Sequence, residues 1–326
     1  MNILLTLIYF AFRSNSFGFL LTYSYLCIMK QAMIFAAGLG TRLKPLTDTM
    51  PKALVPVGGR PLLDINLERL RQAGYTRFVV NVHHFADQIE EHLKEQDARC
   101  KEQGARGKEQ GARSKEQDVR SEEQEMSLAS EIYISDEREL LLDTGGGLKK
   151  AAPLFKDDEP ILIHNVDILD NVDYEWFRRQ HQEDEDAVLL VSRRKTKRYL
   201  LFDNGMRLMG WMNIETGEVK SPYPWLRQAQ LTIDDEWKVC AAADSQFPIF
   251  NYQLTAFAFS GIHSFSPRLF PLMERFPDKF GIMDFYLSIC HRSRIFGCVK
   301  DDLQVLDVGK LDALDKAEEF VKLFTI

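Results

Sequence analysis

FAAGLGTRLKPLTDTMPKALVP, at residues 35–56, continues an apolar run that begins at residue 30 and is expected to form a buried strand. Gly38 and Gly40 allow the backbone to turn tightly and to bring its N–H groups close to a ligand. Successive amides in such a turn form a concavity that binds anions, and Arg42 and Lys52 add two positive charges. The stretch therefore predicts a loop that binds a triphosphate.

Two common phosphate-binding loops do not match this stretch. The Walker A pattern is absent, and residues 38–43 lack the third glycine of the dinucleotide-binding GxGxxG pattern. A Gly–Pro surface loop with incidental charges would explain a bare GxG. It does not explain AAGxGTR, PLT, PKAL and PV in one short stretch, so a specific ligand-binding loop is the better interpretation.

Apolar runs alternate with helical patterns along most of the chain, which predicts parallel strands joined by crossover helices. A layered α/β fold follows from this alternation. Strands are expected at 30–38, 77–82, 132–135, 160–167, 187–193 and 256–263, and helices at 61–73, 85–93, 148–155, 174–182, 282–291 and 311–324.

The domain organisation is expected to be simple. Residues 1–28 hold two apolar runs that are too short to span a bilayer, and they are expected to be a non-native extension, with translation starting at Met29, or an anchor. Residues 29–326 are expected to form one domain. Its repeat at 94–125 predicts a disordered or loosely helical insertion. Residues 199–252 predict an irregular excursion on the substrate side, whose tryptophans shape a sugar pocket or form local core.

The bulk composition narrows the function class. The net charge is −7, which gives no support for nucleic-acid binding. Five cysteines are scattered along the chain without a CxxC pair, which argues against a disulfide framework or a zinc site. The cytoplasm is therefore the expected location, and a membrane association is expected only if residues 1–28 are a real anchor.

Residues 35–56 resemble the signature of the sugar-1-phosphate nucleotidyltransferases, also called NDP-sugar pyrophosphorylases. The similarity continues through 30–93 and 131–182 and returns at 256–320, and it is greatest to short, single-domain members. The resemblance implies a Rossmann-like, GT-A-type fold with three layers and a mixed, mainly parallel sheet. It also implies an enzyme that transfers NMP from an NTP to a sugar 1-phosphate and releases pyrophosphate. UTP with N-acetylmuramate 1-phosphate, for cell-wall synthesis, and GTP with mannose 1-phosphate are the two implied substrate pairs.

The resemblance also implies roles for individual residues. Arg42 is implied to stabilise the β- and γ-phosphates, and Lys52 to contact the α-phosphate or the incoming phosphate, so both are candidate catalytic residues. Asn165 is implied to lie on the substrate side. The residues implied to contact the nucleotide are Ala36, Ala37, Gly38, Gly40, Thr41, Arg42, Lys52, Asn81, Thr144, Gly145 and Gly146.

Two acids complete the candidate site. Asp167 ends the strand at 160–167, and Asp307 lies in LDVG at 306–309. The carboxyl ends of strands open onto the ligand crevice, and two carboxylates can hold one Mg²⁺. Each acid alone is better explained as a turn or cap residue, but both match the family's metal-binding aspartates. Val166 stands where the family has Gly or Ala, and a β-branched side chain there could crowd the ligand.

DTGGG, at 143–147, is a second glycine cluster. It is expected to form a turn before the helix at 148–155, where Asp143 or Thr144 could cap that helix. A close approach to the ligand is the other expected role of this turn, and the two roles are compatible.

Two other functions could use the same triphosphate loop. One is a catalytically silent relative that senses nucleotide sugars or serves as an assembly subunit. The other is a choline-phosphate or similar cytidylyltransferase. A silent relative would have had no need to keep Arg42, Lys52, Asp167 and Asp307 together. The expected partners are an NTP and a sugar 1-phosphate, the protein being a monomer or a small homo-oligomer.

Overall fold

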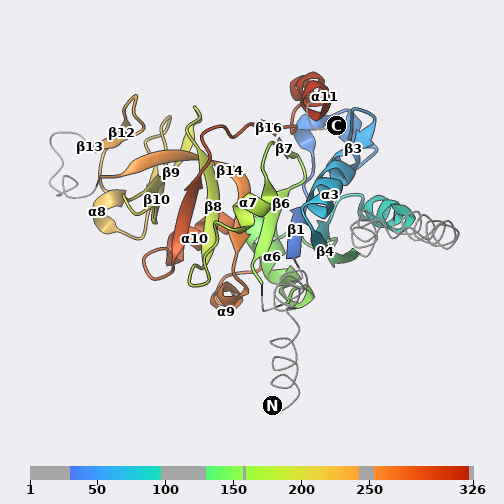
Figure 1. The fold of residues 1–326 in the computed structure, drawn as a ribbon, viewed down its shortest axis with the longest axis horizontal. Coiled ribbons are helices and arrows are strands. Elements are labelled where there is room, and N and C mark those ends of the chain that lie inside the picture. The colour runs from blue at the N-terminus through green and yellow to red at the C-terminus, as the bar shows by residue number, and fades with distance from the viewer. Residues whose placement is uncertain (1–29, 97–129, 157–158, 242–252, 323–326) are drawn as a thin grey trace, which may run out of the picture.

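The computed structural model describes residues 30–96, 130–156, 159–241 and 253–322. One large mixed sheet runs through the molecule, with helices on both of its faces (Figure 1). Its strands, in spatial order, are β11 (Val219–Lys220), β10 (Leu208–Asn213), β9 (Arg198–Phe202), β14 (Thr255–Phe265), β6 (Ile161–Asn165), β1 (Lys30–Phe35), β4 (Tyr75–Val82) and β5 (Glu131–Asp136). In addition, β8 (Ala187–Ser192) pairs with β14, and β15 (Ile295–Val299) pairs with β8.

Four parallel strands, β6, β1, β4 and β5, form the half of the sheet that carries the glycine-rich loop. β1 pairs in parallel with β4 on one side and with β6 on the other, and β4 pairs in parallel with β5. The chain returns between these strands through helices, because parallel neighbours need a crossover. These helices are α3 (Leu62–Gln72), a helix over 86–96, and α6 (Asp143–Ala151). The predicted α/β fold with a mixed sheet is confirmed, and parallel pairing prevails in this half of the sheet.

The other half of the sheet is largely antiparallel, and here one prediction was wrong. β14 runs antiparallel to β6, β8 and β9, and β9, β10 and β11 follow one another as hairpins. Residues 199–241 are therefore not irregular: besides these strands they hold α8 (Pro224–Arg227), β12 (Leu231–Ile233) and β13 (Val239–Ala241). The strands are short and are separated by turn residues, so the turn signals hid the strand pattern.

Alternate side chains of each central strand enter different cores. On β1, Ala32 and Ile34 belong to the core beneath α3, whereas Met33 and Phe35 belong to the core beneath α6. The first core also holds part of α11 (Leu314–Lys322), and the second is closed by α10 (Ile282–Ile289). This alternation follows from the two-residue period of a strand, and it produces three layers.

The tryptophans of the antiparallel half form local core. Trp225 and Trp237 pack on a third, smaller cluster around Tyr199 and Leu201, and Trp211 packs on the core beneath α6. Of the two alternatives for these side chains, the structure therefore supports core packing.

Some expectations lie outside the described residues, namely those for 1–28, for most of the repeat at 94–125 and for 242–252. Within the described parts of the chain, no helix combines the length and the apolar character that crossing a bilayer requires.

Candidate active site

A pocket of about 400 Å³ opens over the carboxyl ends of β1, β4, β5 and β6. This is the edge at which parallel sheets bind ligands. The pocket brings together seven of the residues predicted to contact nucleotide, substrate or metal, which are Ala37, Gly38, Lys52, Asn81, Thr144, Asn165 and Asp167. Glu137, Leu141 and Lys279 also line it, and sequence reasoning missed them. Glu137 follows the end of β5 as Asp167 follows the end of β6, which is the signal that could have found it.

The glycine-rich loop has two different kinds of glycine. Gly40 adopts a left-handed conformation, with φ of 65°, and a side chain there would lie 2.8 Å from Thr47 Cγ2. The Gly40 carbonyl accepts hydrogen bonds from Leu43 N–H and from the Thr47 hydroxyl, so Gly40 shapes the turn. Gly38 instead has open space where a side chain would stand. This space leaves room for a ligand beside the backbone.

The two alanines before the glycines are held by Asn81. The Ala36 and Ala37 N–H groups donate to Asn81 Oδ1, at 2.7 and 3.3 Å. Asn81 is buried at the end of β4. Because both alanine amides are already bonded, the backbone N–H groups left to meet an anion begin at Gly38.

Lys52 and Asp167 form an ion pair inside the pocket. The Lys52 ammonium donates to Asp167 Oδ2, and the two side chains are only 11% and 15% exposed. Lys52 opens a 3₁₀ turn, Lys52–Leu54, at the end of the loop, while Asp167 lies two residues after the last residue of β6. The fold therefore joins the positive end of the loop to an acid that lies more than a hundred residues away in the chain.

Arg42 and Asp307 form a second, looser pair at the rim. Arg42 Nη2 lies 3.6 Å from Asp307 Oδ2, and both side chains are about half exposed. Asp307 ends β16 (Val305–Asp307), which pairs antiparallel with β7 (Ile168–Asp170). The Val308 N–H donates to the Asp167 carbonyl at 2.8 Å. This ladder brings the two predicted metal-binding aspartates to the same end of the sheet.

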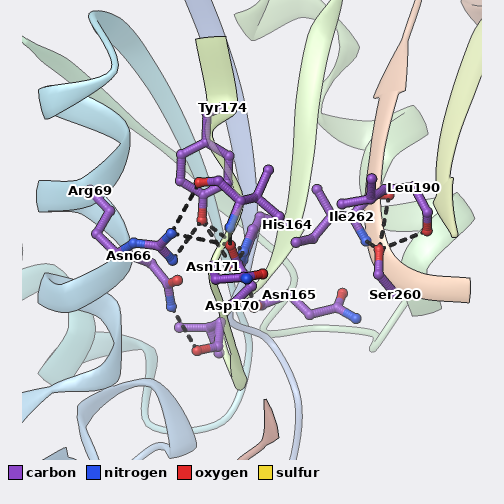
Figure 2. A network of polar contacts seen from close by, with 12 residues as sticks. Asn66, Arg69, His164, Asn165, Asp170, Asn171, Tyr174, Leu190, Ser260 and Ile262 are labelled. Carbon is purple, nitrogen blue, oxygen red and sulfur yellow. Dashed lines mark hydrogen bonds and ion pairs between the residues drawn. The ribbon is translucent and has the colours of Figure 1, made fainter. Parts of the chain in front are cut away.

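A buried polar network supports the β6–β7 segment that carries Asp167. Figure 2 shows Arg69, His164 and Tyr174 around Asp170. His164 Nε2 and the Tyr174 hydroxyl lie 2.9 and 3.0 Å from Asp170 Oδ2, and Arg69 Nη2 lies 3.2 Å from Asp170 Oδ1. Burial by itself raises the pKa of Asp170, but the hydrogen bond and charge of His164, together with Arg69, lower it to about 2. Asp170 is therefore an ionised anchor for this segment.

Asn165 and Val166 lie on either side of the sheet end. Asn165 lines the pocket, and its amide stands where Gly261 of β14 brings the backbone close, since a Cβ on Gly261 would be 3.0 Å from Asn165 Nδ2. Val166 is buried with the core beneath α3, and its carbonyl accepts from Asn66 Nδ2 at 2.9 Å. Val166 therefore belongs to the core and also lines the pocket.

DTGGG forms the first turns of α6, so the expected turn and the expected helix start at 148 were wrong. Leu142 occupies the N-cap position, and no side chain caps the helix. The Gly145 and Gly146 N–H groups both donate to the Phe280 carbonyl, and a Cβ on either glycine would overlap residues 278–280. Close packing therefore stabilises a helix that glycine alone would disfavour.

Several predicted nucleotide contacts lie outside the pocket lining. Gly145 and Gly146 are buried against residues 278–280, and Ala36 is buried beneath the loop. Gly40, Thr41 and Arg42 lie on the outer part of the loop. Asp307 lies beside Arg42, at the rim of the pocket. Thr144 does line the pocket, and its hydroxyl accepts from the Ile282 N–H at 3.0 Å.

Residues 31–200 match the family model described as Nucleotidyl transferase. The chain belongs to this family. Over 138 residues it is 41% identical to N-acetylmuramate alpha-1-phosphate uridylyltransferase of Caulobacter vibrioides, a match that covers 42% of this chain and 46% of that protein. Over 153 residues it is 30% identical to mannose-1-phosphate guanyltransferase beta-B of Xenopus laevis, covering 47% of this chain and 34% of that protein.

The chain is matched over less than half the length of each of these nucleotidyl transferase relatives. A solved structure, the inositol-1-phosphate CTP transferase from T. maritima, aligns over 90% of this chain and 95% of its own, with a TM-score of 0.58. Its sequence identity is 15%. This likeness therefore concerns the nucleotidyl transferase fold alone.

Proposed function

We propose that the protein transfers an NMP group from an NTP to a sugar 1-phosphate and releases pyrophosphate. The observation that carries the proposal is the Lys52–Asp167 pair inside a pocket whose other wall is the open backbone at Gly38. A phosphate oxygen of the sugar phosphate attacks the α-phosphorus of the NTP, and pyrophosphate leaves in line. Such chemistry depends on positioning and on charge neutralisation, since it needs no covalent enzyme intermediate.

The donor set around Asp167 and Asp307 fits a hard divalent cation such as Mg²⁺. Within the described ranges, no group of three or more His, Cys, Asp or Glu could hold a metal. Mg²⁺, however, is usually bound by one or two carboxylates together with waters and substrate phosphates. Asp167 and Asp307 are the residues that would hold it. When bound, it supplies positive charge to the phosphate oxygens at the reacting centre.

Lys52 and Arg42 would then turn toward the phosphates. Both cations are now paired with the two carboxylates, so they are already at the right end of the sheet. Lys52, the more buried of the two, would contact the α-phosphate or the incoming phosphate. Arg42, at the rim, would stabilise the β- and γ-phosphates and the leaving pyrophosphate.

The substrate pair is the finer part of the proposal. We favour UTP with N-acetylmuramate 1-phosphate, because the 41% identical relative is named for that reaction. GTP with mannose 1-phosphate is the second candidate, on the 30% identical relative. The product of the first pair would be a cell-wall precursor. The free Cys240, Cys290 and Cys298 suit a reducing compartment, so we place the reaction in the cytoplasm.

The alternatives have less support. The two relatives reported above are named as sugar-phosphate nucleotidyltransferases. These names give no support to a silent sensor, an assembly subunit or a choline-phosphate cytidylyltransferase.

Pyrophosphate release tests the proposal. The wild-type protein is assayed with UTP, GTP, CTP and dTTP against N-acetylmuramate 1-phosphate, mannose 1-phosphate and choline phosphate. We expect Lys52→Ala and Asp167→Asn to lower the rate on the order of 10²–10³-fold, as loss of a preorganised charge typically does. Lys197→Ala removes an exposed ion pair with Glu215, 2.8 Å long and far along the antiparallel half, and should leave the rate unchanged. Near-normal turnover in both pocket variants would contradict the proposal.

A further inference from the structure

Glu137 is a buried carboxylate that no part of the proposed mechanism uses. It directly follows β5, it lines the pocket, and it is 1% exposed. Its Oε1 accepts a hydrogen bond from Asn81 Nδ2 at 2.7 Å, and its Oε2 accepts from the Leu142 N–H at 3.0 Å. One side chain thus bonds both the end of β4 and the residue that precedes α6.

The contact with Asn81 continues into the glycine-rich loop. An ionised carboxylate can only accept hydrogen bonds. Glu137 therefore requires the Asn81 amide to present its NH₂ group, which leaves Asn81 Oδ1 facing the Ala36 and Ala37 N–H groups. Because the Glu137 carboxylate can only accept, it determines which group donates and which accepts in the hydrogen bonds that lead through Asn81 to the loop.

The surroundings are built to keep Glu137 in this place. Its N–H donates to the Val82 carbonyl at 2.7 Å, and its own carbonyl lies 2.7 Å from His83 Nδ1. The third glycine of DTGGG makes room for it, because a Cβ on Gly147 would lie 2.6 Å from Glu137 Oε1. Gly147 is thereby explained by the carboxylate that it borders.

We propose that Glu137 is a positioning residue for nucleotide binding: it fixes the Asn81 amide and so holds the loop at Gly38 and the wall at Leu141–Thr144 in one arrangement. The inference rests on the proposed function, because it concerns the nucleotide that this function requires. Glu137 does not take part in the chemical step. Its loss should therefore act on the affinity for the NTP rather than on the rate of transfer.

Glu137→Gln tests the direction of the hydrogen bonds that run from residue 137 through Asn81 to the loop, because it replaces an acceptor by a donor with almost no change in shape. The new NH₂ group must face a donor, either the Leu142 N–H or the Asn81 NH₂ group. If Asn81 turns round to avoid this, it presents its own NH₂ group to the Ala36 and Ala37 N–H groups. Either arrangement loses a buried hydrogen bond to a charged acceptor, so we expect the KM for the NTP to rise about tenfold or more, with kcat changed much less.

Exchanging the carboxylate and the amide between positions 137 and 81 should restore the hydrogen bonds to the loop. In the Glu137→Gln, Asn81→Asp double variant, the carboxylate introduced at position 81 can accept from the Ala36 and Ala37 N–H groups. It can also accept from the amide introduced at position 137, whose oxygen accepts from the Leu142 N–H. Asn81→Asp alone places two carboxylates face to face, which is unfavourable. We expect the double variant to reverse most of the rise in KM that each single variant shows. A double variant no better than Glu137→Gln would overturn the inference.

The matched control is Glu139→Gln, the same chemical change on an exposed carboxyl two residues away. It should leave the KM unchanged.

Hydrogen exchange of the ligand-free proteins separates this inference from the proposed function. We expect the amides of Ala36 and Ala37 to exchange about tenfold faster or more in Glu137→Gln than in wild type. If wild type releases no pyrophosphate with any substrate pair but this exchange rises, the transferase proposal fails and the positioning role stands. If the exchange and the KM are both unchanged in Glu137→Gln, the positioning role is wrong, whatever wild type catalyses.

Discussion

The two glycine clusters of this chain look alike in the sequence and serve opposite purposes in the structure. At Gly38, a side chain would meet nothing within 4 Å, so the missing side chain leaves space. At Gly145 and Gly146, a Cβ would lie 2.3 Å from the Phe280 ring and 1.9 Å from the Asp278 carbonyl oxygen, so the space is already filled. Gly38 gives access to a ligand, whereas Gly145 and Gly146 let a helix pack against a loop.

The largest expected effect is on stability and comes from the closely packed glycines of α6, Gly145 and Gly146. Gly146→Ala should lower the free energy of unfolding by about 3 kcal/mol, because its Cβ would overlap the backbone at Asp278, which cannot rotate away. Urea denaturation measures this loss. Gly205→Ala is the control, since its Cβ would lie 3.4 Å from Asp203 Oδ1, an ordinary contact, and its stability should stay within about 0.5 kcal/mol of wild type. A stable Gly146→Ala would break the comparison.

An effect of intermediate size is expected at Gly38, and it concerns the binding of the NTP instead of the stability of the fold. Gly38→Ala should leave the free energy of unfolding within about 0.5 kcal/mol of wild type. Its methyl group would occupy the space beside the loop, so the KM for the NTP should rise about tenfold, which corresponds to about 1.4 kcal/mol. Parallel denaturation and steady-state kinetics check the two halves of this prediction. A destabilised Gly38→Ala with normal kinetics would reverse the roles assigned to the clusters.

The smallest expected effect concerns pH and sharpens the comparison at Gly147. Burial raises the pKa of Glu137, even though hydrogen bonds from Asn81 and Leu142 lower it. A raised pKa means that the folded state binds the proton more tightly than the unfolded state. The stability from this group is thus present below the ordinary carboxyl pKa and is lost as the pH rises through the raised value. As the pH rises through this window, the free energy of unfolding of wild type should fall relative to that of Glu137→Gln. Urea denaturation at several pH values measures this difference. A difference that does not change with pH would contradict the raised pKa of Glu137.

The parallel half of the sheet could be predicted from the sequence because each signal there is local. The run at 30–38 ends in small residues, the pattern at 61–73 has helical spacing, and Asp167 ends a continuous apolar run. Each of these features depends on neighbours in the chain. Residues 199–241 could not be predicted in the same way, because β9 pairs with β14, which follows later in the chain, and β10 and β11 are added to the sheet through β9.

The candidate site was predictable in its residues and less so in its contacts. Gly38 and Lys52 were found because the loop is long and specific, and Asp167 was found because it ends an apolar run and matches the family's metal-binding aspartates. The start of α6 was misplaced, since three consecutive glycines favour a turn until the Phe280 carbonyl accepts two of their N–H groups. Glu137 was missed because it lies in the run DERE at 136–139: a place after the expected strand at 132–135 is shared with Asp136, so this signal alone does not separate the buried acid from its exposed neighbours.

The pairing of β7 with β16 also has a consequence for how the protein is made. Asp167 emerges from the ribosome long before Asp307, with β8, β9, β10, β14 and β15 synthesised between them. A growing chain can pair β1, β4, β5 and β6 early, because domains begin to fold during synthesis. It cannot bring the two carboxylates together until β16 has been added. The pair that would hold the metal can thus form only after all of the intervening strands have been synthesised.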